Sequence, residues 1–569
     1  MNQCYAEKSS LRFGSEIIDS EEGVQQGDPL GPFLFSLGIQ DLVSSCKSEF
    51  NVWYLDDGTL AGDFETVIAD ATMITNSLAT HGLEVNPSKS ELFLVNPRSD
   101  LCKNAPESFN SIMPGIKICN KTDLKLLGAP IYVSAVESVL KPKLENLQLM
   151  MDRLKEIESH EALFLVRHVY GIPKLTYFLR TAPCFMKSEF LQRFDEIIKK
   201  SLISILNINL SERAYIQATL PIAYGGLGIR LATDIALVGF LSSVCATTAA
   251  VQNVLPPNFS HTYYSNELWD SAFKLWCQQS PQKSAPELKI YQSEWDKVIY
   301  EYKYDTLLNS SHSVEEKARL LAVASKSASD WLHSIPIPSL GLKLDSMTLK
   351  ISCGLRLGST LCHPYKCICG EDVEAKGLHG LSCGLQMGRN SRHSQINDLI
   401  KRALVQAKIP AVLQPSNLST SDGKRPDGLT LSTWKNGKCL IWDATVTDSL
   451  CKSSVLLCSK KAGAAAESRE TRKSSHYKDL ANDYLFVPVA IETFGSWGSD
   501  SHKLIKDIGS KMMEATGEKR SSFFLFQQIS MAIQRGNTSC ILGTVPHSKG
   551  LEEIFEFVMS HKSNNDIIN

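Results

Sequence analysis

Two adjacent carboxylates, Asp56 and Asp57, follow an apolar stretch near the start of the sequence. Val52 and Tyr54 before them, and residues 59–61 after them, are strand formers. The Asp-Gly dipeptide that ends at Gly58 predicts a tight hairpin with positive φ. Carboxylates fixed side by side repel each other unless a cation binds there, and hard oxygen ligands suit Mg²⁺. An ordinary Asp-Gly turn is the alternative interpretation.

A second group of residues has the types that bind zinc. Three thiols and one imidazole lie in a short span, at Cys367, Cys369, His379 and Cys383. They are the ligand set of a tetrahedral structural Zn²⁺ site, and the glycine after the second cysteine lets the backbone bend around the ion. Cys362 and His363 are alternative ligands. The competing interpretation is four unrelated residues in a cysteine-rich chain.

A third group begins at Asp427, in Arg425-Pro-Asp-Gly428, and continues to Asp443, in an apolar run over 438–447. The turn signal Asn436-Gly437 lies between them and predicts a β-hairpin. Such a hairpin brings the two carboxylates together, where they would bind Mg²⁺. The alternatives are a turn residue for Asp427 and a charge at a strand edge for Asp443.

The elements that position these residues are indicated by hydrophobic spacing. Apolar residues recur at helical intervals at Leu144, Leu147, Met151 and Leu154, and further helical segments are predicted over 162–179 and 190–206. An amphipathic helix with Ile396, Leu399, Ile400 and Leu404 on one face precedes the predicted hairpin. The pattern then becomes that of strands, so helices and strands are mixed within the second half of the chain.

Length and composition are those of a globular protein with three or four domains. The chain has 569 residues, of which 43% are apolar and 21% charged. The net charge of −2 gives no overall basic signal, so a nucleic-acid surface must come from local patches. The 16 scattered cysteines favour free thiols and a metal site over disulfides, hence an intracellular protein. No run reaches the roughly 18 apolar residues of a spanning helix, which predicts no membrane partner. The pattern carries no signal for an oligomeric state.

Four pieces of sequence, in order, resemble the palm of reverse transcriptases of the non-LTR retrotransposon type. They are Gly23-Val-Gln-Gln-Gly-Asp-Pro29, Tyr54-Leu-Asp-Asp57, His81-Gly-Leu-Glu-Val-Asn-Pro-Ser-Lys89 and Leu126-Leu-Gly-Ala-Pro130. The resemblance implies that Gln26 and Gly27 contact template and nucleotide, that Asp56 and Asp57 bind the catalytic metal, and that Lys89 lies near the triphosphate. It also implies that the Leu-Gly turn grips the primer.

The chain departs from that family at one catalytic position. The family's first catalytic Asp lies on a palm strand well before the Gln-Gly-Asp-Pro segment, and no residue of 1–22 fits it. Two-metal phosphoryl transfer requires carboxylates from both palm strands. We therefore expect an amino-terminally truncated reverse transcriptase that does not polymerise DNA.

The third group resembles the Pro-Asp…Asp/Glu-x-Lys nuclease core, and more narrowly the restriction-like endonuclease at the carboxy end of some non-LTR retrotransposon proteins. Position 445 is Thr where the parent motif has Lys, and Lys473-Ser-Ser-His-Tyr477 fits the subgroup whose Lys lies on a later helix. By this resemblance Asp427 and Asp443 bind the Mg²⁺ that acidifies a water, and Lys473 orients that water or offsets phosphate charge. Tyr477 supports Lys473 or contacts the DNA backbone, and Arg469 and Arg472 add cations. Glu492, which ends an apolar strand, is interpreted first as structural and is a weaker candidate for the same metal.

Together these patterns predict a multidomain α+β protein that nicks target DNA and binds the element's RNA in the nucleus. The expected domains are a partial palm with an antiparallel sheet, a helical thumb, a helical connector, a zinc knuckle and an α/β restriction-endonuclease-like core, at 1–132, 133–245, 246–350, 351–390 and 391–560. The expected cofactors are Mg²⁺ and Zn²⁺. The alternative is a non-catalytic or domesticated nucleic-acid-binding protein derived from a retrotransposon.

Overall fold

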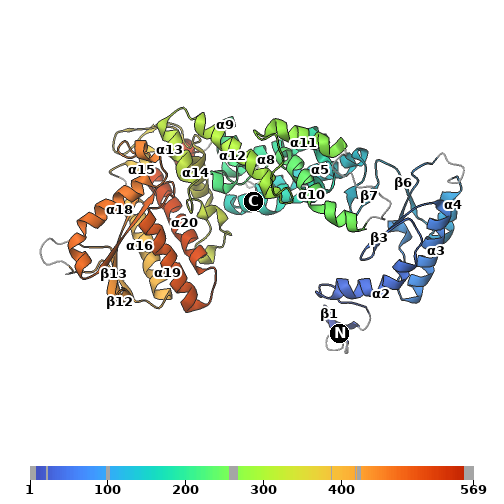
Figure 1. Cartoon of the computed structure of the whole chain (residues 1–569). Helices are drawn as coiled ribbons and strands as arrows, with labels where there is room; N and C mark the ends of the chain where they lie inside the picture. Colours follow the sequence, from blue (N-terminus) through green and yellow to red (C-terminus); the bar gives the residue numbers. More distant parts are fainter. Residues whose placement is uncertain are drawn as a thin grey trace, which may run out of the picture. The chain divides into compact units, whose positions relative to one another are not determined.

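The computed structural model describes residues 8–20, 23–97, 103–254, 267–385, 388–416, 418 and 425–555. The chain divides into two compact units, Met1–Ser138 and Val139–Asn569, which are described separately (Figure 1). Helices and strands occur in both, so the prediction of a multidomain α+β protein is confirmed.

The first unit consists of small sheets with helices packed on them. Its antiparallel hairpins are β1 (Ser9–Phe13) with β2 (Glu16–Ser20), β3 (Phe50–Tyr54) with β4 (Asp57–Ala61), and β7 (Lys125–Leu126) with β8 (Ala129–Pro130). Its long helices, α2 (Gly31–Ser45) and α3 (Phe64–Thr80), bury Ile39, Ile74 and Leu78 in one core. The later strands β5 (Glu91–Phe93) and β6 (Lys117–Cys119) pair in parallel, which the expectation of an antiparallel sheet did not include. The helix α4 (Ala105–Ile112) packs on α3.

The hairpin of β3 and β4 turns one step earlier than the sequence predicts. Tyr54 pairs with Asp57, so the two loop residues are Leu55 and Asp56, and the positive φ of 56° belongs to Leu55. Gly58 lies inside β4 opposite Trp53, and a Cβ there would stand 2.7 Å from the indole ring. The glycine is therefore required by cross-strand packing and not by the turn.

The second unit begins with helices that confirm the predicted helical segments. They are α5 (Val136–Leu154), α6 (Ser159–Leu165), α7 (Thr176–Thr181), α8 (Ser188–Leu206), α9 (Glu212–Thr219), α10 (Ala232–Val254), α11 (Glu267–Gln279), α12 (Gln292–Asn309), α13 (Val314–Val323) and α14 (Ser346–Leu357). The stripe predicted on the first of them is buried, since Leu144, Leu147, Met151 and Leu154 are at most 8% exposed.

The prediction that no stretch is long and apolar enough to span a membrane is wrong for α10. Its residues Ala232–Asn253 pass that test by length and composition. In the structure 56% of this apolar stretch is buried, and α7, α8, α11 and α12 pack against the helix. A helix surrounded by other helices is apolar on most of its sides because it lies in the core.

The end of the second unit is an α/β domain around one mixed sheet. Its strands β11 (Ala411–Leu413), β12 (Gly428–Lys435), β13 (Lys438–Thr447) and β14 (Leu485–Glu492) lie in this order in the sheet. The first three are antiparallel, and the predicted turn between β12 and β13 is confirmed by positive φ at Asn436 and Gly437. β14 is parallel to β13, and the connection between them contains α17 (Val455–Cys458) and α18 (Ala464–His476).

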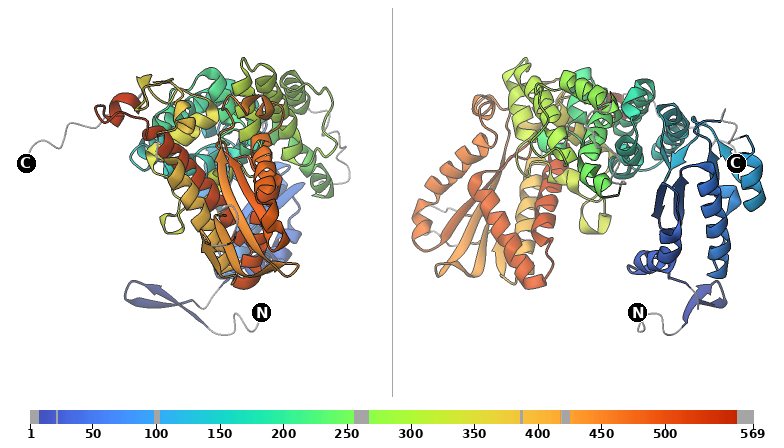
Figure 2. Two further views of the ribbon diagram at one scale, coloured as in Figure 1. Left: turned by 90° about the vertical axis from the view of Figure 1, so that its left-hand side faces the viewer. Right: turned by 45° about the vertical axis from the view of Figure 1, so that its right-hand side comes forward.

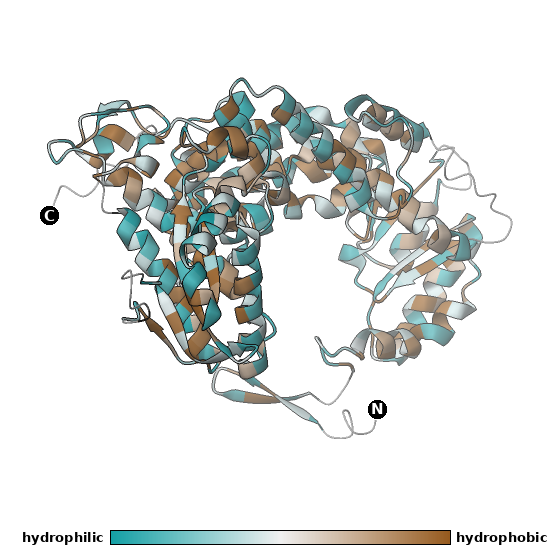
Figure 3. Ribbon diagram, turned by 60° about the vertical axis from the view of Figure 1, so that its left-hand side comes forward, coloured by the Kyte–Doolittle hydropathy of each residue, from teal (hydrophilic) through white to brown (hydrophobic). Residues whose placement is uncertain are grey.

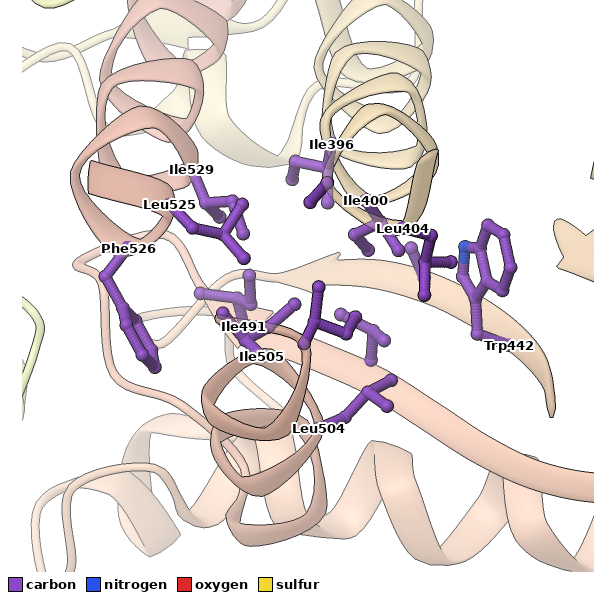
Figure 4. Packing of buried hydrophobic residues seen from close by; sticks show 14 of the residues in the cluster. Ile396, Ile400, Leu404, Trp442, Ile491, Leu504, Ile505, Leu525, Phe526 and Ile529 are labelled. Atoms are coloured by element: carbon purple, nitrogen blue, oxygen red, sulfur yellow. The ribbon is translucent and has the colours of Figure 1, made fainter. Parts of the chain in front are cut away.

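Helices cover both faces of this sheet (Figure 2). α16 (Gly388–Gln406), α19 (Ser499–Thr516) and α20 (Ser521–Leu542) lie on one face, and their apolar side chains meet Trp442 and Ile491 of the strands (Figure 4). On the other face, Ile441 packs with Tyr477 and Leu480, at and beyond the end of α18. Apolar side chains therefore line strands and helices where they face each other (Figure 3).

A small Cys/His module precedes the α/β domain and packs on α20. It contains β9 (Tyr365–Lys366), β10 (Asp372–Val373) and the short helix α15 (His379–Ser382). Ile368 N donates to Thr544 O at 3.2 Å, and the hydroxyls of Tyr365 and Thr544 are hydrogen-bonded at 2.7 Å. The module is thus fixed to residues far along the chain.

Candidate functional site

The register of the β12–β13 hairpin places Asp427 beside Asp443. Gly428 pairs with Trp442, so the residues before and after these two are neighbours at the same end of the hairpin. Asp427 Oδ2 accepts a hydrogen bond from Ala444 N at 2.7 Å, which ties the first carboxylate to the second strand. The two side chains are 15% and 13% exposed, so both lie in a partly buried recess.

Gly428 allows the two strands to pair closely at this end of the hairpin, where Asp427 lies beside Asp443. A Cβ at this position would stand 2.0 Å from the ring of Trp442. Trp442 itself is fully buried on the face covered by α16, where its Nε1 donates to Asn397 Oδ1 at 3.0 Å. Since side chains alternate along a strand, Trp442 turns toward one face of the sheet and Asp443 toward the other.

The structure brings Lys473 to the same point from α18. Its Nζ donates to Asp443 Oδ2 at 2.5 Å. Tyr477, one turn later, is 5% exposed, and its hydroxyl donates to Arg425 O at 3.2 Å, just before Asp427. Tyr477 therefore braces the loop that carries Asp427, and a buried side chain is not available to contact a DNA backbone directly. Burial raises the pKa of Tyr477.

The sequence did not single out His393, which also belongs to this group. Its Nε2 lies 2.8 Å from Asp427 Oδ2, and the donor atoms of His393, Asp427 and Asp443 all lie within 4.8 Å of one another. His393 is on the first turns of α16, on the same helix as the predicted apolar stripe. Its side chain remains 40% exposed, so the ring borders solvent while it contacts the carboxylate.

Burial and mutual contact set opposite pKa shifts in the two carboxyls. Burial raises the pKa of Asp443, and Lys473 opposes the rise. Burial also acts on Asp427, but hydrogen bonds from His393, Asp443 and Ala444 N outweigh it and lower the pKa of Asp427. The hydrogen bond with Asp427 raises the pKa of His393. Two carboxylates with split pKa values and flanking cations are a pattern typical of functional sites.

The remaining candidates of this domain lie around the site. Arg469 and Arg472 are exposed on α18. Glu492 is fully buried, and its carboxylate accepts from Ser449 Oγ at 2.9 Å and from Ala465 N at 2.9 Å. Glu492 thus satisfies backbone donors at the start of α18, in agreement with the structural role expected for it.

The four predicted zinc ligands converge in the Cys/His module. The sulfur atoms of Cys367 and Cys383 are 3.7 Å apart, and Cys369 Sγ is 3.3 Å from His379 Nε2. All four donor atoms lie within 4.8 Å of one another. A backbone hydrogen bond from Glu371 is the first of several contacts that lower the pKa of Cys369. The alternative ligand Cys362 instead directs its sulfur at the carbonyl oxygens of Glu374 and Ala375.

The palm-like residues of the first unit show less convergence. Asp56 and Asp57 are exposed at the hairpin, Gln26 and Gly27 are exposed in the loop before α2, and Lys89 is exposed at the end of a short 3₁₀ turn. Within the described residues, no group of three His, Cys, Asp or Glu donors includes Asp56 or Asp57. Among the residues that the structure describes, the two carboxylates there have no third ligand of these types in reach.

Comparison with known proteins agrees with the resemblance in the first unit and extends beyond it. Residues 1–131 match the family model described as reverse transcriptase (RNA-dependent DNA polymerase). The chain is 22% identical over 496 residues to the "Retrotransposable element SLACS 132 kDa protein" of Trypanosoma brucei gambiense. That alignment covers 84% of this chain and 36% of that protein, so the chain spans about a third of the relative's length. The chain is thus similar to reverse transcriptases over residues 1–131 and to a retrotransposon-encoded protein over most of its length.

Proposed function

We propose that the α/β domain is a metal-dependent DNA endonuclease of the restriction-like kind that nicks target DNA in the nucleus. One observation carries the proposal. Asp427 and Asp443 from two strands, Lys473 from α18 and the brace of Tyr477 meet in one partly buried recess.

The donor set fits a divalent cation. Two carboxylates and one imidazole lie close enough to share an ion, and hard oxygen ligands suit Mg²⁺. Asp427 and Asp443 would hold such an ion, which would supply a water of lowered pKa for attack on the phosphodiester. Lys473, which contacts Asp443, would offset charge that develops on the phosphate. Tyr477 keeps the loop of Asp427 in place.

The Cys/His module fits Zn²⁺ in the same way. Three sulfur donors and one ring nitrogen at mutual distances below 4.8 Å have the composition and spacing of a closed structural site. We assign the module a structural role, in which the ligands hold the segment that packs on α20.

We further propose that the described residues do not polymerise DNA. Template-directed copying by two metals requires carboxylates from both palm strands, and Asp56 and Asp57 have no third ligand within the described residues. The partners of the protein are then target DNA and the element's RNA, the second bound without being copied. A non-catalytic nucleic-acid-binding protein is the alternative.

Nicking of supercoiled plasmid tests the proposal. The purified full chain, with Zn²⁺ present during expression and with Mg²⁺ or Mn²⁺ added, is expected to yield open circles. Asp427→Asn is expected to lower the rate at least 100-fold with an unchanged circular dichroism spectrum. Asp483→Asn, an exposed carboxylate before β14, is the matched control. Plasmid binding without nicking by a folded chain, under both metals, would establish the non-catalytic alternative.

A further inference from the structure

His393 has contacts that neither the palm-like residues nor the predicted nuclease residues explain. It is the only imidazole in the described part of the chain that joins a group of candidate metal donors with two carboxylates. Its Nε2 is 2.8 Å from Asp427 Oδ2. In an octahedral site with ligand distances of about 2.1 Å, neighbouring donor atoms are about 3 Å apart. The observed spacing is that of a hydrogen bond, and it also allows the two atoms to bind one ion together with Asp443.

The ring is held with this nitrogen facing the site. Asn397, one helical turn later on α16, has its Nδ2 3.4 Å from His393 Nε2. The Oδ1 of Asn397 accepts from the buried Trp442 Nε1 at 3.0 Å, which orients the amide and directs its amino group at the imidazole. Trp442 is next to Asp443 in β13. The buried residue that packs against Gly428 in the hairpin therefore also orients Asn397, which contacts His393.

We propose that His393 is a third protein ligand of the cation held by Asp427 and Asp443, and that it makes the site favour a transition ion such as Mn²⁺ over Mg²⁺. Imidazole nitrogen binds first-row transition ions well, whereas Mg²⁺ prefers oxygen and keeps several waters. A site made of two carboxylates alone offers only oxygen ligands, which suit Mg²⁺. The nitrogen at the third position shifts the relative affinity toward Mn²⁺ and the ions after it in the series. The inference rests on the proposed nuclease function and adds its metal preference.

Binding of Mn²⁺ to the full, zinc-loaded chain tests the ligand directly, without any catalysis. Electron paramagnetic resonance counts the bound ion, and the electron spin echo of bound Mn²⁺ reports an attached imidazole nitrogen. The expected result is one Mn²⁺ per chain with a nitrogen signal, both lost in Asp443→Asn, which places the ion in this recess. His393→Gln keeps a hydrogen-bond donor for Asp427 and is expected to weaken Mn²⁺ binding at least tenfold and to remove the nitrogen signal.

Two further variants make the outcome decisive. His393→Glu restores a ligand through oxygen and is expected to bind Mg²⁺, measured by competition with Mn²⁺, more tightly relative to Mn²⁺ than the natural chain does. His312→Gln, an exposed histidine before α13, is the control and is expected to behave as the natural chain. If His393→Gln keeps both the Mn²⁺ affinity and the nitrogen signal, His393 only orients Asp427 and the proposal is wrong.

The result separates the ligand from the reaction. Mn²⁺ bound with a nitrogen signal, in a chain that does not nick plasmid, would retain His393 as a ligand and reject the nuclease function. If the natural chain and His393→Gln nick plasmid with the same dependence on Mn²⁺ and on Mg²⁺, the nuclease function is retained and His393 is rejected as a ligand.

Discussion

Lys473 is the residue whose removal separates catalysis from folding most cleanly. Its ammonium group contacts Asp443 at 2.5 Å, yet its side chain is 22% exposed and lies on the outer layer of the domain. Replacement by Met keeps the apolar stem and removes the charge. The carboxyl of Asp443, whose pKa is already raised by burial, can then take up a proton in place of the lost partner.

We therefore expect Lys473→Met to fold normally and to nick plasmid about 100-fold to 1,000-fold more slowly than the natural chain, the cost of losing one charge-stabilising group. Lys478→Met, an exposed lysine just after α18, is expected to retain the natural rate. Equal rates in both variants would show that Lys473 is a surface charge without a role in the reaction.

Gly428 carries a prediction about stability. An added Cβ would meet the ring of Trp442 at 2.0 Å, so Gly428→Ala must displace a buried indole or the hairpin. Overpacking of this kind costs about 1 to 3 kcal/mol, and the shift also moves Asp427, so nicking falls as well. Gly437→Ala, in the turn with a φ of 74° and open space around it, is expected to cost about 1 kcal/mol and to spare nicking. Chemical denaturation and the plasmid assay measure the two effects.

At the scale of single residues, the motifs predict the two carboxylates, the lysine and the tyrosine of the candidate site but not its histidine. Residues with a recognisable motif, such as Asp427, Asp443 and Lys473, can be predicted because their neighbours in sequence carry the signal. His393 has no such motif. Its neighbour Arg392 is 2% exposed and donates to Asn537 Oδ1, whereas His393 faces the site, and only the packing of α16 decides which of the two turns inward.

The Cys/His module carries a prediction about an element. Three sulfur atoms and one ring nitrogen converge in a segment with two short strands and one short helix, too small to have a core of its own. Elemental analysis of the purified chain is expected to find one Zn²⁺, lost in Cys369→Ser. Cys362→Ser is the control, since that sulfur contacts carbonyl oxygens instead of the ligand group. Loss of Zn²⁺ in Cys362→Ser with retention in Cys369→Ser would reverse the ligand assignment.

A buried histidine makes the helical region sensitive to acid. His160 on α6 is 3% exposed, its Nδ1 accepts from Leu344 N at 3.0 Å, and burial lowers its pKa to about 4. The unfolded chain, with a histidine pKa of about 6.5, therefore binds the proton first as pH falls. The contribution of neutral His160 to the free energy of unfolding is complete above pH 6.5. It is lost as pH falls toward 4, by up to about 3 kcal/mol.

His160→Gln, which retains an acceptor for Leu344 N, is expected to narrow the difference between the denaturation midpoints measured at pH 7 and pH 5. His312→Gln, with an exposed side chain, is expected to leave that difference unchanged. An identical pH dependence in the natural chain and in His160→Gln would show that another group is responsible.

At the scale of elements, long periodic segments were predictable and short ones were not. The stripe of α5 and the Asn436-Gly437 turn follow from spacing and residue type. The strand β11 has only three residues, Ala411–Leu413, which is too short for a period to show. The turn after β3 was misplaced because the glycine next to Asp57 serves Trp53 across the hairpin, a contact that no local pattern reveals.

At the scale of the whole second unit, α20 is the element that joins the parts. It contacts α14 of the helical region, α15 of the Cys/His module, and α16 and α19 of the α/β domain. Its residues come after the sheet in sequence, so the contacts are long-range and the sequence alone does not indicate them. Helical segments such as α5 and the turn between β12 and β13 were predictable from spacing and residue type, while the way the parts share one helix was not.

The two compact units carry separate sets of carboxylates, Asp56 and Asp57 in the first and Asp427 and Asp443 in the second. The proposed function assigns the DNA chemistry to the second set alone. Removing the first pair is then expected to leave nicking intact, whereas a single change in the second pair abolishes it. If nicking is lost when the first pair is removed and is retained when the second pair is changed, the cleavage belongs to the first unit.

The most direct test is therefore the rate of plasmid nicking by the full chain, measured side by side for the natural protein, Asp56→Asn with Asp57→Asn, and Asp443→Asn. We expect equal rates for the natural protein and the double variant Asp56→Asn with Asp57→Asn. For Asp443→Asn we expect a loss of at least 100-fold, with all three proteins folded by circular dichroism. A folded Asp443→Asn that nicks as fast as the natural protein would contradict the central claim that this recess is a nuclease centre.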